Sequence, residues 1–195
     1  MIARRARIYD ALALLTAIIV ITIDQWTKSL VVSHLGPPDL GPLVPLIGQY
    51  LVLYYIRNTG AAFSMFDTNG PVLIVLIAIA VAVIAYLYIR MLNSGSMLSK
   101  LIFGLIIGGA TGNLLDRFFH GSVVDFIWFR IPQINYSFAI FNIADSAISI
   151  GVVLLFCTLL LSSLRSKPKA ETADQPAASK TLLPAQQIQE QDAQP

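Results

Sequence analysis

The chain has 195 residues, of which 56% are hydrophobic and only 12% are charged, and its mean hydropathy is +0.71. This apolar share is higher than that of an ordinary soluble domain and is typical of a membrane protein. The net charge of +2 comes without a basic run interleaved with aromatic residues, which argues against nucleic-acid binding, and the single cysteine and two isolated histidines match no metal-binding spacing.

Four apolar segments predict four transmembrane helices, because a helix that crosses a bilayer needs about 20 mostly apolar residues. Arg4, Arg5 and Arg7 before the first segment would also suit a signal peptide, but no small-residue cleavage site follows, so we expect an uncleaved helix. In the third segment Gly104, Gly108 and Gly112 form a ridge that lets another helix approach closely. The predicted spans are about 11–32, 72–89, 101–115 and 141–164.

The distribution of basic residues predicts how the four helices are oriented. Short cytoplasmic segments carry an excess of Lys and Arg. One side of the bundle would carry eight basic residues and the other side Lys28, Arg57, Arg117 and Arg130. Both termini and the 90–100 loop are therefore expected in the cytoplasm, with the 36–70 and 118–140 segments outside. The eight are Arg4, Arg5, Arg7, Arg90, Lys100, Arg165, Lys167 and Lys169.

The outer segments contain strand patterns. Residues 50–56 are β-branched and aromatic and are bounded by Gly48 and a turn at 58–60, and 126–129 and 135–138 are shorter candidates. We therefore expect an α-helical membrane domain over residues 1–165 with a small periplasmic β platform. Residues 166–195 are rich in Pro, Ala and Gln, which predicts a disordered cytoplasmic tail.

Asp125 and Asp145 are the strongest candidates for chemistry. A carboxylate in the hydrocarbon core costs at least ~2.5 kcal/mol, so Asp145, in the opening turns of the fourth span, is a functional candidate. Asn142 and Ser149 share its helix face and could instead be interhelical hydrogen-bonding groups. Asp125 lies between Val-Val and Phe-Ile, and the alternative for it is a turn or cap.

Two carboxylates in a partly dry cleft cannot both ionise comfortably, so such a pair holds one proton. The ionised member could take a proton from water as the water attacks a carbonyl, and the protonated member could polarise that carbonyl. The sequence leaves open which aspartate carries the proton.

Other charged residues at the same end have structural explanations. Asp24 and Lys28 have the i, i+4 spacing of a helical ion pair, which we interpret as structural. Asp116 follows Asn113 by one turn, and Arg117 can pair with a carboxylate, so this group is either a brace or part of the site.

Five fragments, taken together and in this order over about residues 8–165, carry a family resemblance. They are Asp24-Gln25-x-x-Lys28, Asn58-Thr59-Gly60-Ala61-Ala62-Phe63, Gly112-Asn113-Leu114-x-Asp116-Arg117, Val123-Val124-Asp125-Phe126 and Phe141-Asn142-x-Ala144-Asp145. Their combination resembles the lipoprotein signal peptidase family, also called signal peptidase II.

The resemblance implies a multi-pass aspartic endopeptidase of the bacterial inner membrane, with its active site near the periplasmic face. It would cut the signal peptide from a diacylglyceryl-modified prolipoprotein, just before the lipidated cysteine, without a cofactor or metal ion. Asp125 and Asp145 would be catalytic, and the other matched residues would bind substrate or support the site. Expected partners are the substrate, membrane lipids and globomycin-type inhibitors, with the protein a monomer. The supporting residues are Asn58, Gly60, Asn113, Arg117, Asn142, Asp24, Lys28 and Asp116.

Two other classes of membrane protein also use intramembrane aspartates. A proton-coupled transporter usually shows paired halves with broken helices, and this sequence has no internal repeat. A non-catalytic scaffold would tolerate Asp125→Asn and Asp145→Asn, whereas a peptidase would not.

Overall fold

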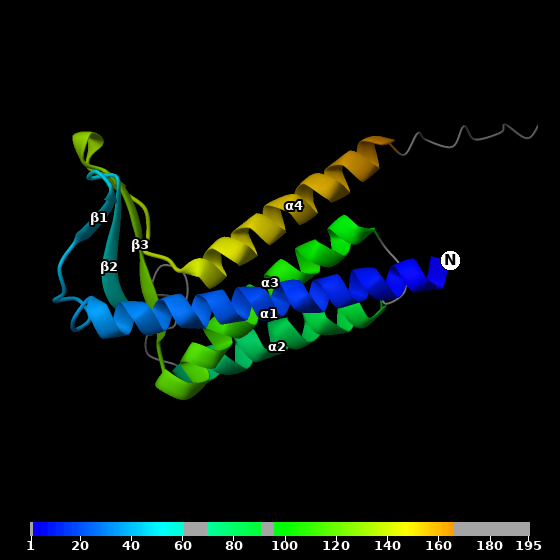
Figure 1. Ribbon diagram of the computed structural model, residues 1–195, viewed down its shortest axis with the longest axis horizontal. Coiled ribbons are helices and arrows are strands. Elements are labelled where there is room, and N and C mark those ends of the chain that lie inside the picture. The colour runs from blue at the N-terminus through cyan, green and yellow to red at the C-terminus, as the bar shows by residue number, and fades with distance from the viewer. Residues whose placement is uncertain (1, 61–69, 91–95, 166–195) are drawn as a thin grey trace, which may run out of the picture.

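The computed structural model describes residues 2–60, 70–90 and 96–165, and the predicted tail, 166–195, lies outside them. Four long helices make up most of this part of the chain, and a small sheet lies at one end of the bundle (Figure 1). Figure 1 also shows the N-terminus and the end of the last helix at the opposite end. The helices are α1 (Ile2–His34), α2 (Gly70–Arg90), α3 (Met97–His120) and α4 (Ile143–Arg165).

The helices confirm the predicted membrane architecture. Three of them are long and apolar enough to cross a bilayer, over Ala6–His34, Met97–His120 and Ile143–Leu164, and Ile74–Arg90 is a shorter apolar helix. Large apolar side chains such as Leu14 and Phe156 are well exposed along α1 and α4. Lipid is the environment that accommodates such surfaces.

The helix limits differ from the predicted spans for a physical reason. Hydropathy marks where a segment becomes polar, whereas helix ends depend on capping. Ser96 caps the start of α3 by accepting from Ser99 N at 3.1 Å, and Gly121, with φ of 70°, ends it in a left-handed cap. Asp116 therefore lies inside α3, and Lys100, predicted to end a cytoplasmic loop, is a buried residue of α3 paired with Asp10 at 2.6 Å.

The predicted glycine ridge on α3 is the contact surface for α1. A methyl group added at Gly104 would lie 2.6 Å from Ala13 O, and one added at Gly108 would lie 2.9 Å from Ala17 O. One added at Gly112 would lie 2.7 Å from Asp24 Oδ2. The close approach permitted by these glycines places Asp24 directly against α3.

A four-stranded antiparallel sheet forms the outer end of the molecule, in the order β1-β2-β3-β4. The three predicted strands are confirmed, although the second is longer than expected, so that Asp125 lies in a strand rather than in a turn. The first strand was not predicted, and it contains Pro45, which an edge strand tolerates. The strands are β1 (Val44–Ile47), β2 (Leu51–Asn58), β3 (Val123–Ile131) and β4 (Tyr136–Ser137).

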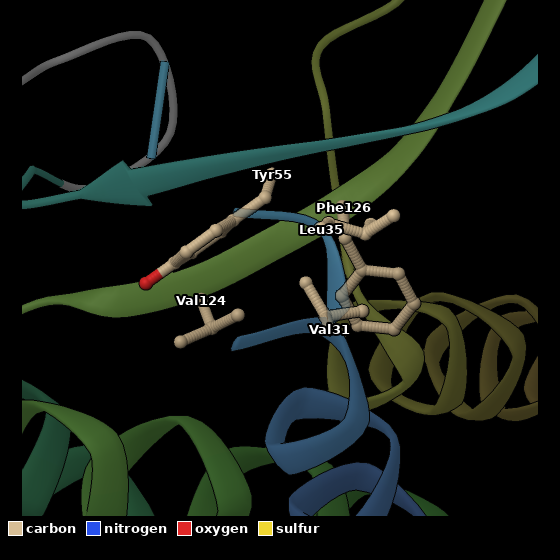
Figure 2. Packing of buried hydrophobic residues seen from close by; sticks show 5 residues of the cluster. All are labelled: Val31, Leu35, Tyr55, Val124 and Phe126. Atoms are coloured by element: carbon tan, nitrogen blue, oxygen red, sulfur yellow. The ribbon is translucent and has the colours of Figure 1, made fainter. Parts of the chain in front are cut away.

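A hydrophobic cluster joins the sheet to the outer end of α1 (Figure 2). Val31 and Leu35 pack against Tyr55 of β2 and against Val124 and Phe126 of β3. Because side chains alternate along a strand, Asp125 points away from the face that carries its two apolar neighbours. The cluster therefore fixes the position of the strand that carries Asp125.

The segment before α4 is hydrogen-bonded to the same strand. Phe141 O accepts from Phe126 N at 3.1 Å and from Ile127 N at 2.8 Å, and Phe141 N donates to Ile127 O at 3.0 Å. These three bonds hold the start of α4 beside β3. They bring Asn142 and Asp145 next to Asp125.

Candidate active site

Asp125 lies in β3 with both carboxylate oxygens hydrogen-bonded. Its Oδ2 accepts from Asn58 Nδ2 at 2.9 Å and its Oδ1 accepts from Asn142 Nδ2 at 2.7 Å. Asn58 belongs to the neighbouring strand, and its own Oδ1 accepts from Gly60 N at 3.0 Å. The turn predicted at 58–60 therefore orients the Asn58 amide with its NH2 group toward Asp125.

Asp145 lies in the first turn of α4, where Asn142 is the N-cap. Asn142 Oδ1 accepts from Asp145 N at 2.9 Å, and Asp145 Oδ2 accepts from Asn142 N at 3.2 Å. This reciprocal pair is a capping box, which satisfies two N–H groups at the helix start. The second oxygen, Asp145 Oδ1, accepts from Asn113 Nδ2 of α3 at 2.7 Å.

Asn142 connects the two aspartates, because its side-chain NH2 binds Asp125 and its backbone N–H binds Asp145. Asn142 and Asp125 are almost completely buried, whereas Asp145 is half-buried. The structure thus brings together the two residues predicted to form the dyad. Ser149, predicted to share the polar face of Asp145, is exposed on α4.

Burial raises the pKa of Asp125 from 3.8 to about 6. The negative charge of Asp145 raises this pKa further, while the hydrogen bonds from Asn58 and Asn142 and the charge of Lys28 lower it. Desolvation is the largest of these effects. Asp125 can therefore hold a proton close to neutral pH, as a general acid must.

A buried ion network lies beside the two aspartates. All three hydrogens of the Lys28 ammonium group have acceptors, with Nζ 2.7 Å from Asp24 Oδ2, 2.9 Å from Asp116 Oδ2 and 3.0 Å from Asn113 Oδ1. Lys28, Asp24 and Asp116 are each no more than 3% exposed. The predicted Asp24–Lys28 ion pair is present, and it extends to a second carboxylate.

The two carboxylates of this network hold other elements in place. Asp24 Oδ1 accepts from Ala144 N at 2.9 Å, so a residue of α1 binds the first turn of α4. Asp116 Oδ2 accepts from Val124 N at 3.3 Å, so α3 binds the strand that carries Asp125. Both ends of the proposed dyad are thereby attached to one buried charge cluster.

The sequence suggested a carboxylate partner for Arg117, but its guanidinium group donates to backbone oxygens. Its Nη2 donates to Gly60 O at 2.9 Å and its Nη1 donates to Asn113 O at 3.3 Å. Arg117 Nε is buried and has no hydrogen-bond partner in the described part of the chain. The guanidinium reaches backbone oxygens because Gly60 ends the turn after β2 directly beside α3.

Gln25 is the residue of this region to which we assigned no role from the sequence. Its Nε2 donates to Asp116 Oδ1 at 2.9 Å and to Asp24 Oδ2 and Gly112 O at 3.2 Å. The available signal was its place between Asp24 and Lys28 in an otherwise apolar helix. It adds a neutral donor where two carboxylates lie close to each other.

Comparison with known proteins agrees with this architecture. The sequence model of the signal peptidase (SPase) II family matches residues 16–161. The chain is 45% identical to the lipoprotein signal peptidase of Anoxybacillus flavithermus over 142 residues, covering 73% of this chain and 81% of that protein. It is 40% identical to the Bacillus subtilis lipoprotein signal peptidase over 151 residues, covering 77% and 94%.

A solved structure of a bacterial membrane enzyme has the same fold. Its TM-score is 0.72 at 31% sequence identity, with 82% of this chain and 93% of that chain covered. The match extends over most of both proteins. The chain therefore belongs to the lipoprotein signal peptidase family, signal peptidase II, and is a multi-pass membrane peptidase.

Proposed function

We propose that this chain is an aspartic endopeptidase that removes the signal peptide from diacylglyceryl-modified bacterial prolipoproteins, cutting just before the lipidated cysteine. The observation that carries the proposal is the shared contact of Asp125 and Asp145 with Asn142, at 2.7 and 3.2 Å. Family membership supports the substrate class. The dyad supplies a base and an acid within one polar cluster.

Asp145 acts as the base in this mechanism. It accepts from Asn113 Nδ2 and Asn142 N, and it lies at the N-terminus of α4, where the helix dipole favours a negative charge. Asp125 carries the shared proton, in agreement with its pKa of about 6. The different surroundings of the two carboxylates separate their roles.

Hydrolysis then follows in two balanced steps. Asp145 takes a proton from water as the water oxygen bonds to the scissile carbonyl carbon, and Asp125 gives its proton to the carbonyl oxygen. In the second step the C–N bond breaks, Asp145 returns its proton to the leaving nitrogen, and a hydroxyl of the intermediate returns a proton to Asp125. Both residues end in their starting protonation states.

Arg117 is our candidate for holding the substrate backbone. Its Nε is a buried donor without a partner in the described ranges, and it lies on the same side chain that binds Gly60 O beside Asn113. An unsatisfied buried donor is costly, so a substrate carbonyl that accepts from it would bind favourably. Apolar surfaces of the helices would take up the signal helix and the acyl chains.

We place the protein in the bacterial inner membrane as a monomer, with both termini cytoplasmic and the dyad at the periplasmic face. The excess of Lys and Arg at the end opposite the sheet supports this orientation. A lipid-anchored precursor in the outer leaflet would then reach the dyad laterally. Globomycin-type inhibitors would compete for the same site.

The decisive experiment is cleavage of a purified lipidated precursor by Asp125→Asn and Asp145→Asn variants. Each change removes the acid or the base, so turnover should fall at least ~100-fold while the protein still accumulates in the membrane. Parallel assays with a precursor that lacks the diacylglyceryl group test the substrate class. Normal processing by both variants would refute the dyad.

A further inference from the structure

The three asparagines around the dyad share one arrangement. In each, the side-chain oxygen accepts a hydrogen bond, and this orients the side-chain NH2 group toward a carboxylate. For Asn58 that donor is Gly60 N at 3.0 Å, and for Asn142 it is Asp145 N at 2.9 Å. Both of these donors are backbone groups.

Asn113 is different, because a lysine side chain occupies its oxygen. Lys28 Nζ donates to Asn113 Oδ1 at 3.0 Å, and Asn113 Nδ2 donates to Asp145 Oδ1 at 2.7 Å. Asn113 Oδ1 also accepts from Asn142 Nδ2 at 3.1 Å. That NH2 group donates to Asp125 Oδ1 and Val124 O as well. Among the described residues, Lys28 is therefore the only charged donor to any of the three amide oxygens.

A hydrogen bond from an ammonium group both orients and polarises the amide that accepts it. Bonds to charged groups are roughly twice as strong as neutral ones, and hydrogen bonds in series strengthen one another. An Asn113 amide held in this way presents its NH2 group, rather than its oxygen, to Asp145. That orientation gives the Asp145 carboxylate an N–H donor and holds it in place for the proposed role as a base.

The carboxylates around Lys28 hold it in this position. Nζ binds Asp24 on its own helix turn and Asp116 on α3, and burial excludes water from all three groups. The ammonium group has no further hydrogen to donate elsewhere.

We propose that Lys28 is a positioning residue for peptide hydrolysis, which acts through the Asn113 amide to keep Asp145 available as a base. This inference rests on the proposed function and adds a residue of α1 to the catalytic apparatus, although Lys28 itself touches neither aspartate of the dyad. A purely structural brace would affect stability without changing how activity depends on pH.

The test removes the ammonium group from a protein in which Asp116, one of its two carboxylate partners, has already been neutralised. Lys28→Met combined with Asp116→Asn replaces one cation and one anion, and the reference is Asp116→Asn alone. Loss of one charge-assisted bond should lower kcat roughly 10-fold at its pH optimum and displace the acidic limb of the kcat–pH profile to higher pH. KM for the lipidated precursor should stay the same, because Lys28 does not meet the substrate.

Adding Asn113→Ala to both proteins shows whether the effect passes through the amide. Without the Asn113 side chain, exchanging Lys28 should produce no further displacement of the acidic limb. An equal displacement in that background, or an unchanged profile in the first comparison, would overturn the role of Lys28. If Asp125→Asn and Asp145→Asn abolish cleavage in either case, the proposed function stands without it.

Lys100→Met is the matched control, because Lys100 is the other buried lysine with an ion pair between α1 and α3. It should lower thermal stability and leave the pH profile unchanged. If the methionine variant at Lys28 does not accumulate, Lys28→Gln with Asp116→Asn makes the same comparison. Glutamine can still bond Asp24 within its own helix turn, but its shorter side chain does not reach Asn113.

Discussion

At Asp125, burial and hydrogen bonding act on the carboxyl group in opposite directions. Two amide donors favour the charged form, but the loss of water has the larger effect, and the pKa rises to about 6. A carboxyl group with this raised pKa suits the proposed role as an acid, but at neutral pH its burial is unfavourable for folding. Asp125 should therefore reduce stability at neutral pH.

This cost predicts how stability depends on pH. Between about pH 4 and pH 6 the folded protein binds a proton that the unfolded chain has released, so the free energy of unfolding falls as pH rises through this window. Asp125→Asn removes this dependence. From pH 4 to pH 7, the free energy of unfolding of the parent should fall by up to ~3 kcal/mol relative to that of Asp125→Asn.

Unfolding of the two proteins in detergent, followed at several pH values, measures this difference. Asp39→Asn, at an exposed position outside the helices, corrects for the general effect of removing an acid. A constant difference between parent and Asp125→Asn across the range would contradict the prediction. Asp125→Asn also alters two hydrogen bonds, but this effect is the same at every pH and does not change how the difference depends on pH.

Much of the polar cluster could be predicted from the sequence, because charged residues are rare in apolar segments and each one needs an explanation. The partners could not be predicted with the same success. Arg117 binds carbonyl oxygens, and Ala144 contributes only its backbone N–H to Asp24. Such backbone contacts leave no trace in residue type, so only the folded chain reveals them.

At the level of elements, α3 is central because its glycines allow close contact on two faces. Gly108 packs against Ala17 of α1, and the neighbouring Gly109 faces Ala144 of α4. Asn113, which binds both Lys28 and Asp145, lies four to five residues further along the same helix, and Asp116, which binds Lys28, lies seven to eight residues further. Spacing between helices in the bundle should therefore control the geometry of the site.

Gly108→Ala should destabilise the protein by about 1–3 kcal/mol, because the added methyl group would lie 2.9 Å from Ala17 Cα and O. Ser149→Ala in α4 is the control, because Ser149 is exposed and its change introduces no close contact between helices. Thermal unfolding in detergent should show a clearly lower midpoint for Gly108→Ala alone. Equal midpoints would show that the α1–α3 contact is not tight.

The prediction of elements succeeded where one property decided the outcome. Apolar length identified the helices, and β-branched and aromatic residues identified β2. The strand at Val44–Ile47 was missed because it is short and contains Pro45, and its pairing with β2 depends on a register that only the fold provides. Similarly, β3 begins at Val123 because it pairs with Asn58, far away in sequence.

On the scale of the whole molecule, buried charges lie at both ends of the helical bundle. The outer end has the Lys28 network beside the sheet, and the opposite end has Lys100 paired with Asp10, with Tyr88 donating to the same carboxylate. All residues of the proposed site lie between Asp24 and Asp145. The chain beyond α4 contributes none of them.

Truncation after Ser166 should therefore leave turnover unchanged. The removed segment is polar and Pro-rich and follows the last helix, and none of the proposed site residues lies in it. Cleavage of the lipidated precursor by the truncated and full-length proteins, at equal amounts in membranes, is the measurement. A large drop in turnover would assign the tail a role in catalysis.

The bond between Asp24 and Ala144 has a consequence for how the protein is made. The first helix enters the membrane when most of the chain has not yet been synthesised. Its Asp24 carboxylate lacks one hydrogen-bond donor, the backbone N–H of Ala144, until the start of the last helix arrives. Asn142 and Asp145 arrive with that same helix. If Asp125 and Asp145 are the catalytic pair, as proposed, the chain gains its activity only after its final span has docked.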